Sequence, residues 1–363
     1  MKRREFIKRA GAGVAGSAIA APALAQSQPQ IRWRMASSFP KSLDTLFGTA
    51  EQIAGRVSRL TEGRFEIRIF AAGEIVPALQ VLDAVQNGTV ECGQSASYYY
   101  IGKNPALAFD TALPFGMNAR QQNAWMYYGG GLQLTRELFQ QYSIVNFPCG
   151  NTGTQMAGWY RKEINSVNDL KGLKMRVAGL AGQILAKLGV VPQQIGGGDI
   201  YAALEKGTID AAEWVGPYDD EKLGFHKVAK YYYYPGWWEG SAQLSIYVNA
   251  KQWASLPKPY QEALEVACVE ANVNMMARYD AKNTEALRRL VGAGAQLRAF
   301  PRPVMEACYN VAQDMYKEFS SKSPEFRKIY ASWSRFRDDQ YLWFRVAENT
   351  FDNFVYSIRK PKK

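Results

Sequence analysis

The chain has 363 residues, of which 47% are hydrophobic and 21% are charged, so it has enough length and apolar content for two globular lobes and is not a disordered chain. The formal net charge is +11, and it falls to +7 without the first 25 residues, which carry five basic side chains and one acidic one. No run of Lys or Arg is interleaved with aromatic residues, so the charge suits capture of small anions better than binding of nucleic acid.

The N-terminus has the pattern of an export signal. Residues 2–4 read Lys-Arg-Arg, a twin-arginine signature, and a short, weakly apolar run follows from residue 10 to residue 20. This run is too short to cross a bilayer, and Ala-Leu-Ala at 23–25 forms a cleavage site. We therefore predict a twin-arginine signal peptide over residues 1–25, a mature chain that begins at Gln26, and a periplasmic location.

Strands and helices alternate at the start of the mature chain. Strands are predicted over residues 31–36, 65–70 and 90–94, with helices over 46–60 and 76–85. This β-α-β-α-β order predicts a first α/β lobe. The loop of residues 37–44 is expected to lie at a cleft.

Ser97, Tyr98 and Tyr99 directly follow the third predicted strand, where open α/β sheets bind their ligands. We predict that they contact a ligand, and the alternative is an aromatic wall packed on the lobe. Gln155 lies in a turn before the strand predicted over residues 157–160. Its amide would reach a metal or a ligand, or else only stabilise the turn.

The stretch from residue 173 to residue 225 organises the second half of the chain. Short strands are predicted over residues 173–177, 190–195 and 209–215, with helices between them, which indicates a parallel sheet. Arg176, Glu213 and Trp214 lie near strand ends, where such sheets bind ligands. The alternative for Arg176 and Glu213 is a partly exposed ion pair that contributes about 0–1 kcal/mol.

The C-terminal half is mostly helical. Glu239 precedes a strand predicted over residues 242–248 and is a candidate acidic ligand of a cation, or else a surface cap or pair. Residues 260–291 have helical spacing and would span roughly 48 Å as one helix. Another helix is predicted over residues 301–320, and the aromatic tail from 326 to 358 carries an apolar stripe at helical spacing.

Three segments together resemble a known family. They are Lys-Met-Arg-Val at 174–177, Leu-Glu-Lys-Gly-Thr-Ile-Asp-Ala-Ala-Glu at 204–213, and Glu-Trp-Val-Gly-Pro-Tyr-Asp-Asp at 213–220. The combination resembles the DctP-like solute-binding proteins of TRAP transporters, and in particular the branch that binds 2-oxo or 2-hydroxy acids beside a metal ion. The resemblance implies that Arg176 pairs with the ligand carboxylate and that Glu213 lies in the cleft. Most members follow that glutamate with asparagine, whereas this chain has Trp214.

The resemblance also implies an architecture. The expected fold is an α/β, two-lobe periplasmic binding protein with a hinged cleft, a long spanning helix and an extra C-terminal helix. Lobe 1 would comprise residues 26–150 plus about 240–280, and lobe 2 residues 151–239 plus about 281–322. Residues 323–363 would form the C-terminal helix and build a homodimer, and whether the two subunits exchange this helix is left open.

The expected site combines an anion anchor with a cation. Substrate contacts are assigned to Arg176, Gln155, Ser97, Tyr98, Tyr99 and Trp214, and metal contacts to Gln155, Glu213, Glu239 and the main-chain carbonyl of Trp214. These hard oxygen donors suit Na⁺ or Ca²⁺ better than zinc. The expected function is capture of a pyruvate-like, lactate-like or longer oxo acid and its delivery to the small and large TRAP membrane subunits.

Other functions remain open at this point. An enzyme is not expected, because the single histidine, His226, has no nearby Ser or Cys partner, although Glu213 and Glu239 would suit a carboxylate-pair hydrolase. A solute-binding protein of an ABC system and a purely structural dimer are further alternatives. The four cysteines, Cys92, Cys149, Cys268 and Cys308, contain no CxxC pair, and their disulfide state is left open.

Overall fold

The first of two sheets belongs to one lobe. A computed structural model describes residues 28–358, so the expected signal peptide, its cleavage before Gln26, and residues 359–363 lie outside the described part. The first sheet has the strand order β2-β1-β3-β10-β4. Its strands are β1 (Ile31–Ser37), β2 (Phe65–Phe70), β3 (Cys92–Ser95), β4 (Ile144–Asn151) and β10 (Gln243–Asn249). β1 pairs in parallel with β2 and β3, and β10 runs antiparallel to β3 and β4.

The second sheet forms the other lobe, with the order β11-β9-β5-β8-β6-β7. Its strands are β5 (Gly158–Tyr160), β6 (Lys174–Arg176), β7 (Val191–Gln193), β8 (Ala211–Ala212), β9 (Tyr231–Tyr234) and β11 (Gln296–Ala299). β6 pairs in parallel with β7 and β8, as the alternation of strands and helices predicts. The chain therefore crosses between the lobes through two connecting segments, after β4 and between β9 and β10, and a third time along the helix that joins β10 to β11.

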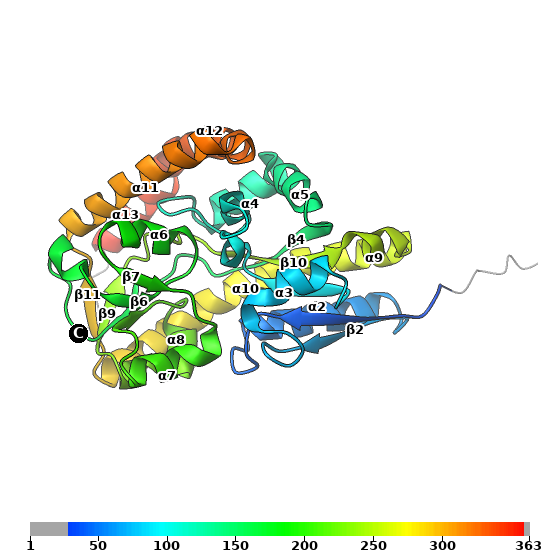
Figure 1. Cartoon of the computed structure of the whole chain (residues 1–363), viewed down its shortest axis with the longest axis horizontal. Helices are drawn as coiled ribbons and strands as arrows, with labels where there is room; N and C mark the ends of the chain where they lie inside the picture. The colour runs from blue at the N-terminus through cyan, green and yellow to red at the C-terminus, as the bar shows by residue number, and fades with distance from the viewer. Residues whose placement is uncertain (1–27, 359–363) are drawn as a thin grey trace, which may run out of the picture.

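Helices cover both sheets and join the lobes (Figure 1). They are α2 (Leu46–Leu60), α3 (Val81–Gln86), α4 (Ala119–Tyr128), α5 (Gly131–Gln140), α6 (Gly179–Lys187), α7 (Ile200–Glu205), α8 (Pro217–Leu223), α9 (Ala250–Ser255), α10 (Lys258–Gly292), α11 (Arg302–Lys322), α12 (Pro324–Val346) and α13 (Glu348–Ile358). Short 3₁₀ turns are η1 (Ala78–Gln80), η2 (Ser97–Tyr100), η3 (Pro105–Asp110), η4 (Val167–Leu170), η5 (Gly197–Asp199) and η6 (Phe225–Lys227). In Figure 1 the long helix α10 runs obliquely from one lobe to the other, as a spanning helix should.

Some predicted elements differ from the structure. The helix predicted over residues 76–85 is divided into η1 and α3, and the strand predicted over 209–215 pairs only at Ala211 and Ala212. The C-terminal tail is two helices rather than one, because the chain leaves helical geometry at Ala347 (ψ −86°). The first half of α12 is fixed to its own chain, since Phe326, Ile329 and Trp333 are buried. Among residues 28–358, no helix has the length and apolarity needed to cross a membrane.

Candidate ligand and cation site

The two crossovers and the strand ends bring the predicted residues together. Tyr98 and Tyr99 lie in η2, directly after β3, while Arg176 ends β6 and Glu213 follows β8. The main-chain N–H of Gln155, which lies between β4 and β5, donates to the carbonyl oxygen of Glu239, between β9 and β10, at 3.1 Å. The two crossing segments are thus bonded to each other beside the site. Every element expected at a strand end or crossover is found there.

Arg176 is buried and held in place by its neighbours. Its side chain is 1% exposed, and Nη1 donates to the main-chain oxygen of Glu213 at 2.6 Å and to the Glu213 carboxylate. Nε donates to the carbonyl of Ile195 at 3.2 Å, and the guanidinium lies 4.8 Å from the centre of the Trp214 ring. Nη2 has no hydrogen-bond partner among the described residues, so one edge of the fork remains available.

The Arg176–Glu213 pair is not the partly exposed ion pair that the sequence left as an alternative. Glu213 is completely buried, so the pair lies in a low-dielectric environment where each charge depends on its partner. Its Oε1 accepts from Arg176 and from the N–H of Ala178 at 3.1 Å, whereas Oε2 has no partner in the described part of the chain. Burial raises the pKa of Glu213 to about 7, against the opposing effect of Arg176.

Two further buried oxygens near Glu213 have no hydrogen-bond partner within residues 28–358. They are Oε2 of Glu239 and Oε1 of Gln155, whose side chains are 2% and 4% exposed. The Gln155 amide is oriented by Thr152, because its Nε2 donates to the Thr152 hydroxyl at 3.1 Å and that hydroxyl donates to the carbonyl of Gly153 at 2.9 Å. Burial and the Glu213 charge raise the pKa of Glu239 well above its usual value.

The unpartnered oxygens of Gln155, Glu213 and Glu239 are suitable ligands for a cation. Buried polar atoms are normally satisfied, and an oxygen acceptor without a donor is costly. One cation would satisfy Gln155, Glu213 and Glu239 together, and an amide and two carboxylates are ligands that Ca²⁺ or Na⁺ accepts. Among residues 28–358 no group of three or more His, Cys, Asp or Glu side chains is placed to hold a metal ion.

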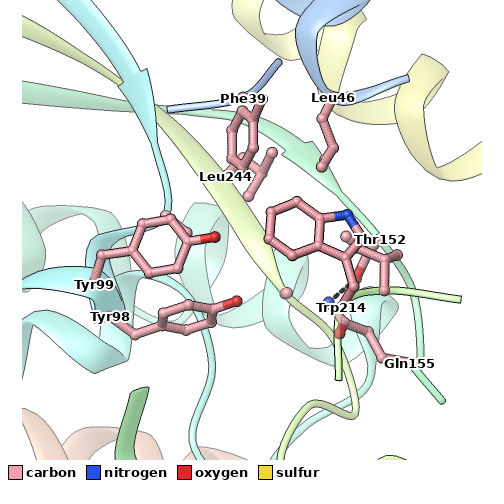
Figure 2. A pocket seen from close by; sticks show the side chains of 11 residues that line it. Phe39, Leu46, Tyr98, Tyr99, Thr152, Gln155, Trp214 and Leu244 are labelled. Carbon is pink, nitrogen blue, oxygen red and sulfur yellow. Dashed lines mark hydrogen bonds between the residues drawn. The ribbon is translucent and has the colours of Figure 1, made fainter. Parts of the chain in front are cut away.

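A small cavity adjoins these groups. It is lined by Phe39, Leu46, Ala96, Tyr98, Tyr99, Thr152, Gln155, Trp214, Val215, Ala242 and Leu244, and its volume of about 10 Å³ is space for about one water molecule. Figure 2 shows the Tyr98 and Tyr99 hydroxyls pointing across this space toward Trp214, with Phe39 and Leu244 above them. The cavity is therefore lined mainly by apolar atoms with a few polar groups, and it lies between the two lobes.

Ser97 is placed differently from the other predicted contacts. It does not line the cavity, and its hydroxyl is bonded to the buried carboxylate of Asp110 and to the Tyr247 hydroxyl, at 2.6 Å. Sequence reasoning did not single out Thr152, Phe39 or Leu244. The loop of residues 37–44, which was expected to lie at the cleft, contains Phe39. No local sequence pattern indicated that Thr152 or Leu244 would line the cavity.

Two α/β lobes, a closed cavity between them, and a buried arginine beside unpartnered oxygens define a protein that encloses a small anionic solute. The family model described as bacterial extracellular solute-binding protein, family 7 (DctP) matches residues 36–323. The chain belongs to this family of TRAP transporter solute-binding proteins, which places it among extracytoplasmic receptors rather than enzymes. The predicted family and two-lobe fold are confirmed, and the family decides against the ABC and hydrolase alternatives.

Similar proteins carry more specific names. The chain is 52% identical over 363 residues, 98% of its length and all of the relative's, to a monocarboxylate 2-oxoacid-binding periplasmic protein of Nostoc sp.. It is 59% identical to a TRAP transporter solute-binding protein from Bordetella bronchiseptica, a mixed-occupancy dimer with copurified calcium and picolinate (TM-score 0.90; 91% of this chain and 98% of that one). A Pseudoalteromonas atlantica protein with bound sodium and pyruvate is 42% identical (TM-score 0.87; 89% and 99%).

Proposed function

We propose that this protein captures a small 2-oxo or 2-hydroxy monocarboxylate, such as pyruvate or lactate or a longer oxo acid, together with Na⁺ or Ca²⁺. It delivers the ligand to the small and large membrane subunits of a TRAP transporter. The observation that carries this proposal is the conjunction of a buried arginine with three unpartnered buried oxygens, on Gln155, Glu213 and Glu239. The name of the Nostoc relative and the pyruvate bound to the Pseudoalteromonas protein support it.

The two halves of the site have different tasks. The free edge of the Arg176 guanidinium receives one carboxylate oxygen of the ligand, because Nη1 and Nε are already engaged. The cation is held by Gln155 Oε1, Glu213 Oε2, Glu239 Oε2 and the Trp214 carbonyl, and it takes the other carboxylate oxygen with the neighbouring 2-oxo or 2-hydroxy oxygen. An anchor of one charge-assisted contact contributes about 1.5–3 kcal/mol, and micromolar binding needs about 8 kcal/mol, so the chelate supplies much of the affinity.

The cavity walls set the size and polarity of the ligand. Tyr98 and Tyr99 present hydroxyls on one side, and the Trp214 indole closes the other (Figure 2). The tail of the ligand would face apolar side chains such as Phe39 and Leu244, which favour a methyl or short alkyl group over a second carboxylate. We leave Ser97 out of this ligand set, because its hydroxyl is committed to Asp110.

The lobe boundaries follow as part of the proposal. Residues 26–150 with about 240–280 would move as one body, and residues 151–239 with about 281–322 as the other. The strands of the first sheet fall in the first set, apart from the last residue of β4, and the strands of the second sheet fall in the other, which supports this division. Export would use the twin-arginine signal of residues 1–25.

We also propose a homodimer built on the C-terminal helix. The end of α12 and all of α13 expose large apolar side chains, at 58–71% of their surface: Leu342, Trp343, Val346, Phe351, Phe354, Tyr356 and Ile358. A patch of this kind on a soluble protein favours an interface, and the Bordetella relative is described as a dimer. Exchange of α13 between two subunits would cover the patch on both.

Calorimetry on protein freed of bound solute and metal tests the ligand and the cation together. After unfolding, refolding and treatment with a chelator, pyruvate is titrated with and without calcium or sodium. We expect micromolar or tighter binding only when a cation is present, and no binding of 2-oxoglutarate, whose second carboxylate lacks a partner. Equal affinity with and without both cations would refute the chelate, and no binding under any condition would refute the ligand class.

A further inference from the structure

A contact between the lobes lies outside the ligand site, at Asp44. This residue belongs to the first-lobe loop between β1 and α2, and its carboxylate accepts hydrogen bonds from Tyr218 (3.0 Å) and Lys222, both on α8 of the second lobe. Arg278 of α10 donates to the same carboxylate, and to the main-chain oxygen of Asp44 at 2.8 Å. Three donors from two helices therefore converge on one side chain, and the two donors on α8 reach it from the second lobe.

Helix α8 presents these donors because of its spacing. Tyr218 and Lys222 are four residues apart and thus lie on the same face, with the Lys222 ammonium 4.0 Å from the centre of the Tyr218 ring. The other face is fixed inside the second lobe, where Asp220 accepts from the Trp159 indole at 3.0 Å and the Tyr232 hydroxyl at 2.7 Å. The donors are thus carried on a rigid arm of the second lobe.

The same arm begins beside the ligand site. Helix α8 starts at Pro217, three residues after Trp214, and the N–H of Val215 donates to Asp220 at 3.3 Å. A movement of α8 away from Asp44 therefore carries Trp214 away from the first-lobe wall of the cavity. The ring of Phe39 on that wall lies 6.4 Å from the Trp214 ring, edge to face.

We propose that Asp44, Tyr218 and Lys222 form a latch that holds the lobes closed, so that residues outside the ligand site set how fast the ligand leaves. The cavity between the lobes has a volume of only about 10 Å³, room for about one water molecule, so the lobes must separate before a carboxylic acid can enter. If the ligand is trapped only in the closed form, its apparent affinity scales with the closed fraction. The effect on ligand affinity rests on the proposed function, whereas the effect on lobe closure does not.

The first test replaces Asp44 and compares it with a matched surface aspartate. Asp83 has a side chain 39% exposed, against 41% for Asp44, and it pairs with Lys103 at 2.6 Å within the first lobe. In the presence of calcium, D44N should raise the Kd for pyruvate roughly three- to tenfold, mainly through faster release in stopped-flow measurements. D83N should change neither the Kd nor the release rate. K222M should raise the Kd by a smaller factor in the D44N background than in the wild-type protein. Equal behaviour of D44N and D83N would overturn the latch.

The second test needs no ligand. Spin labels attached at L60C on α2 and V191C on β7 report the distance between the lobes, and both native side chains are exposed. The four native cysteines are buried and therefore react poorly with the label. D44N should broaden the distance distribution toward longer values in ligand-free protein, whereas D83N should not. An unchanged distribution would refute the latch even if the protein proved to bind a different solute.

Discussion

Replacement of Arg176 by methionine removes the proposed anion anchor and also breaks a buried ion pair. The Arg176 and Glu213 side chains are 1% and 0% exposed, so loss of one partner costs about 3–5 kcal/mol of stability if the other stays charged. The lost contact with the ligand carboxylate contributes about 1.5–3 kcal/mol, which corresponds to roughly a 10- to 150-fold rise in the Kd.

The cost in stability should depend on pH. Burial already raises the pKa of Glu213 to about 7, and loss of the neighbouring positive charge raises it further. A carboxyl group whose pKa is higher in the folded protein than in the unfolded chain stabilises the fold at low pH, and this contribution is lost as the pH rises through the folded value. R176M should therefore be destabilised more at pH 8 than at pH 6, where Glu213 is neutral.

Calorimetry with pyruvate and calcium at pH 7 gives the affinity, and thermal unfolding at pH 6 and pH 8 gives the stability. The control is the double variant R176M/E213Q, which removes both charges of the pair. It should recover stability at pH 8 without recovering binding. Wild-type affinity in R176M would refute the anchor, and an equal loss of stability at both pH values would refute the charge argument.

Three further predictions concern the cation and the assembly. E239Q should weaken calcium binding at least tenfold, and it should leave the metal-free protein as stable or more so, because it replaces a carboxyl group whose pKa burial raises; tight calcium binding by E239Q would contradict this. Calcium affinity should fall by about tenfold per pH unit below about pH 7, because Glu213 must release a proton to bind the ion, and the raised pKa of Glu239 adds to this loss. Calorimetry showing a flat pH profile would exclude that linkage. A chain ending at Ala347 should sediment as a monomer yet bind pyruvate as the full chain does; a persistent dimer would place the interface elsewhere.

Elements with a strong local pattern were predicted well from the sequence. Helix α2 and strand β2 have the predicted bounds, because apolar residues recur at helical spacing from Leu46 to Leu60 and Gly63 separates the helix from the strand. The strand-end positions of Arg176 and Glu213 follow from the same alternation. The break at Ala347 was missed, since neither glycine nor proline marks it.

Contacts between residues far apart in the chain could not be predicted from the sequence. From the sequence, the Ser97 hydroxyl was expected to contact a ligand. Only the fold shows that Asp110 lies within hydrogen-bond distance of it. The complete burial of Arg176 and Glu213 likewise depends on tertiary packing, which no local pattern in the sequence indicates. The contact of Lys222 with Asp44 joins segments 178 residues apart, and no local pattern indicates it.

A crystal structure of the protein grown with calcium and pyruvate tests the central claim most directly, through the anomalous signal of the metal. We expect an anomalous peak about 2.3–2.6 Å from the side-chain oxygens of Gln155, Glu213 and Glu239, with the pyruvate carboxylate bridging the metal and the Arg176 guanidinium. A metal peak elsewhere, or a ligand that leaves Arg176 bonded only to Glu213 and Ile195, would contradict the account.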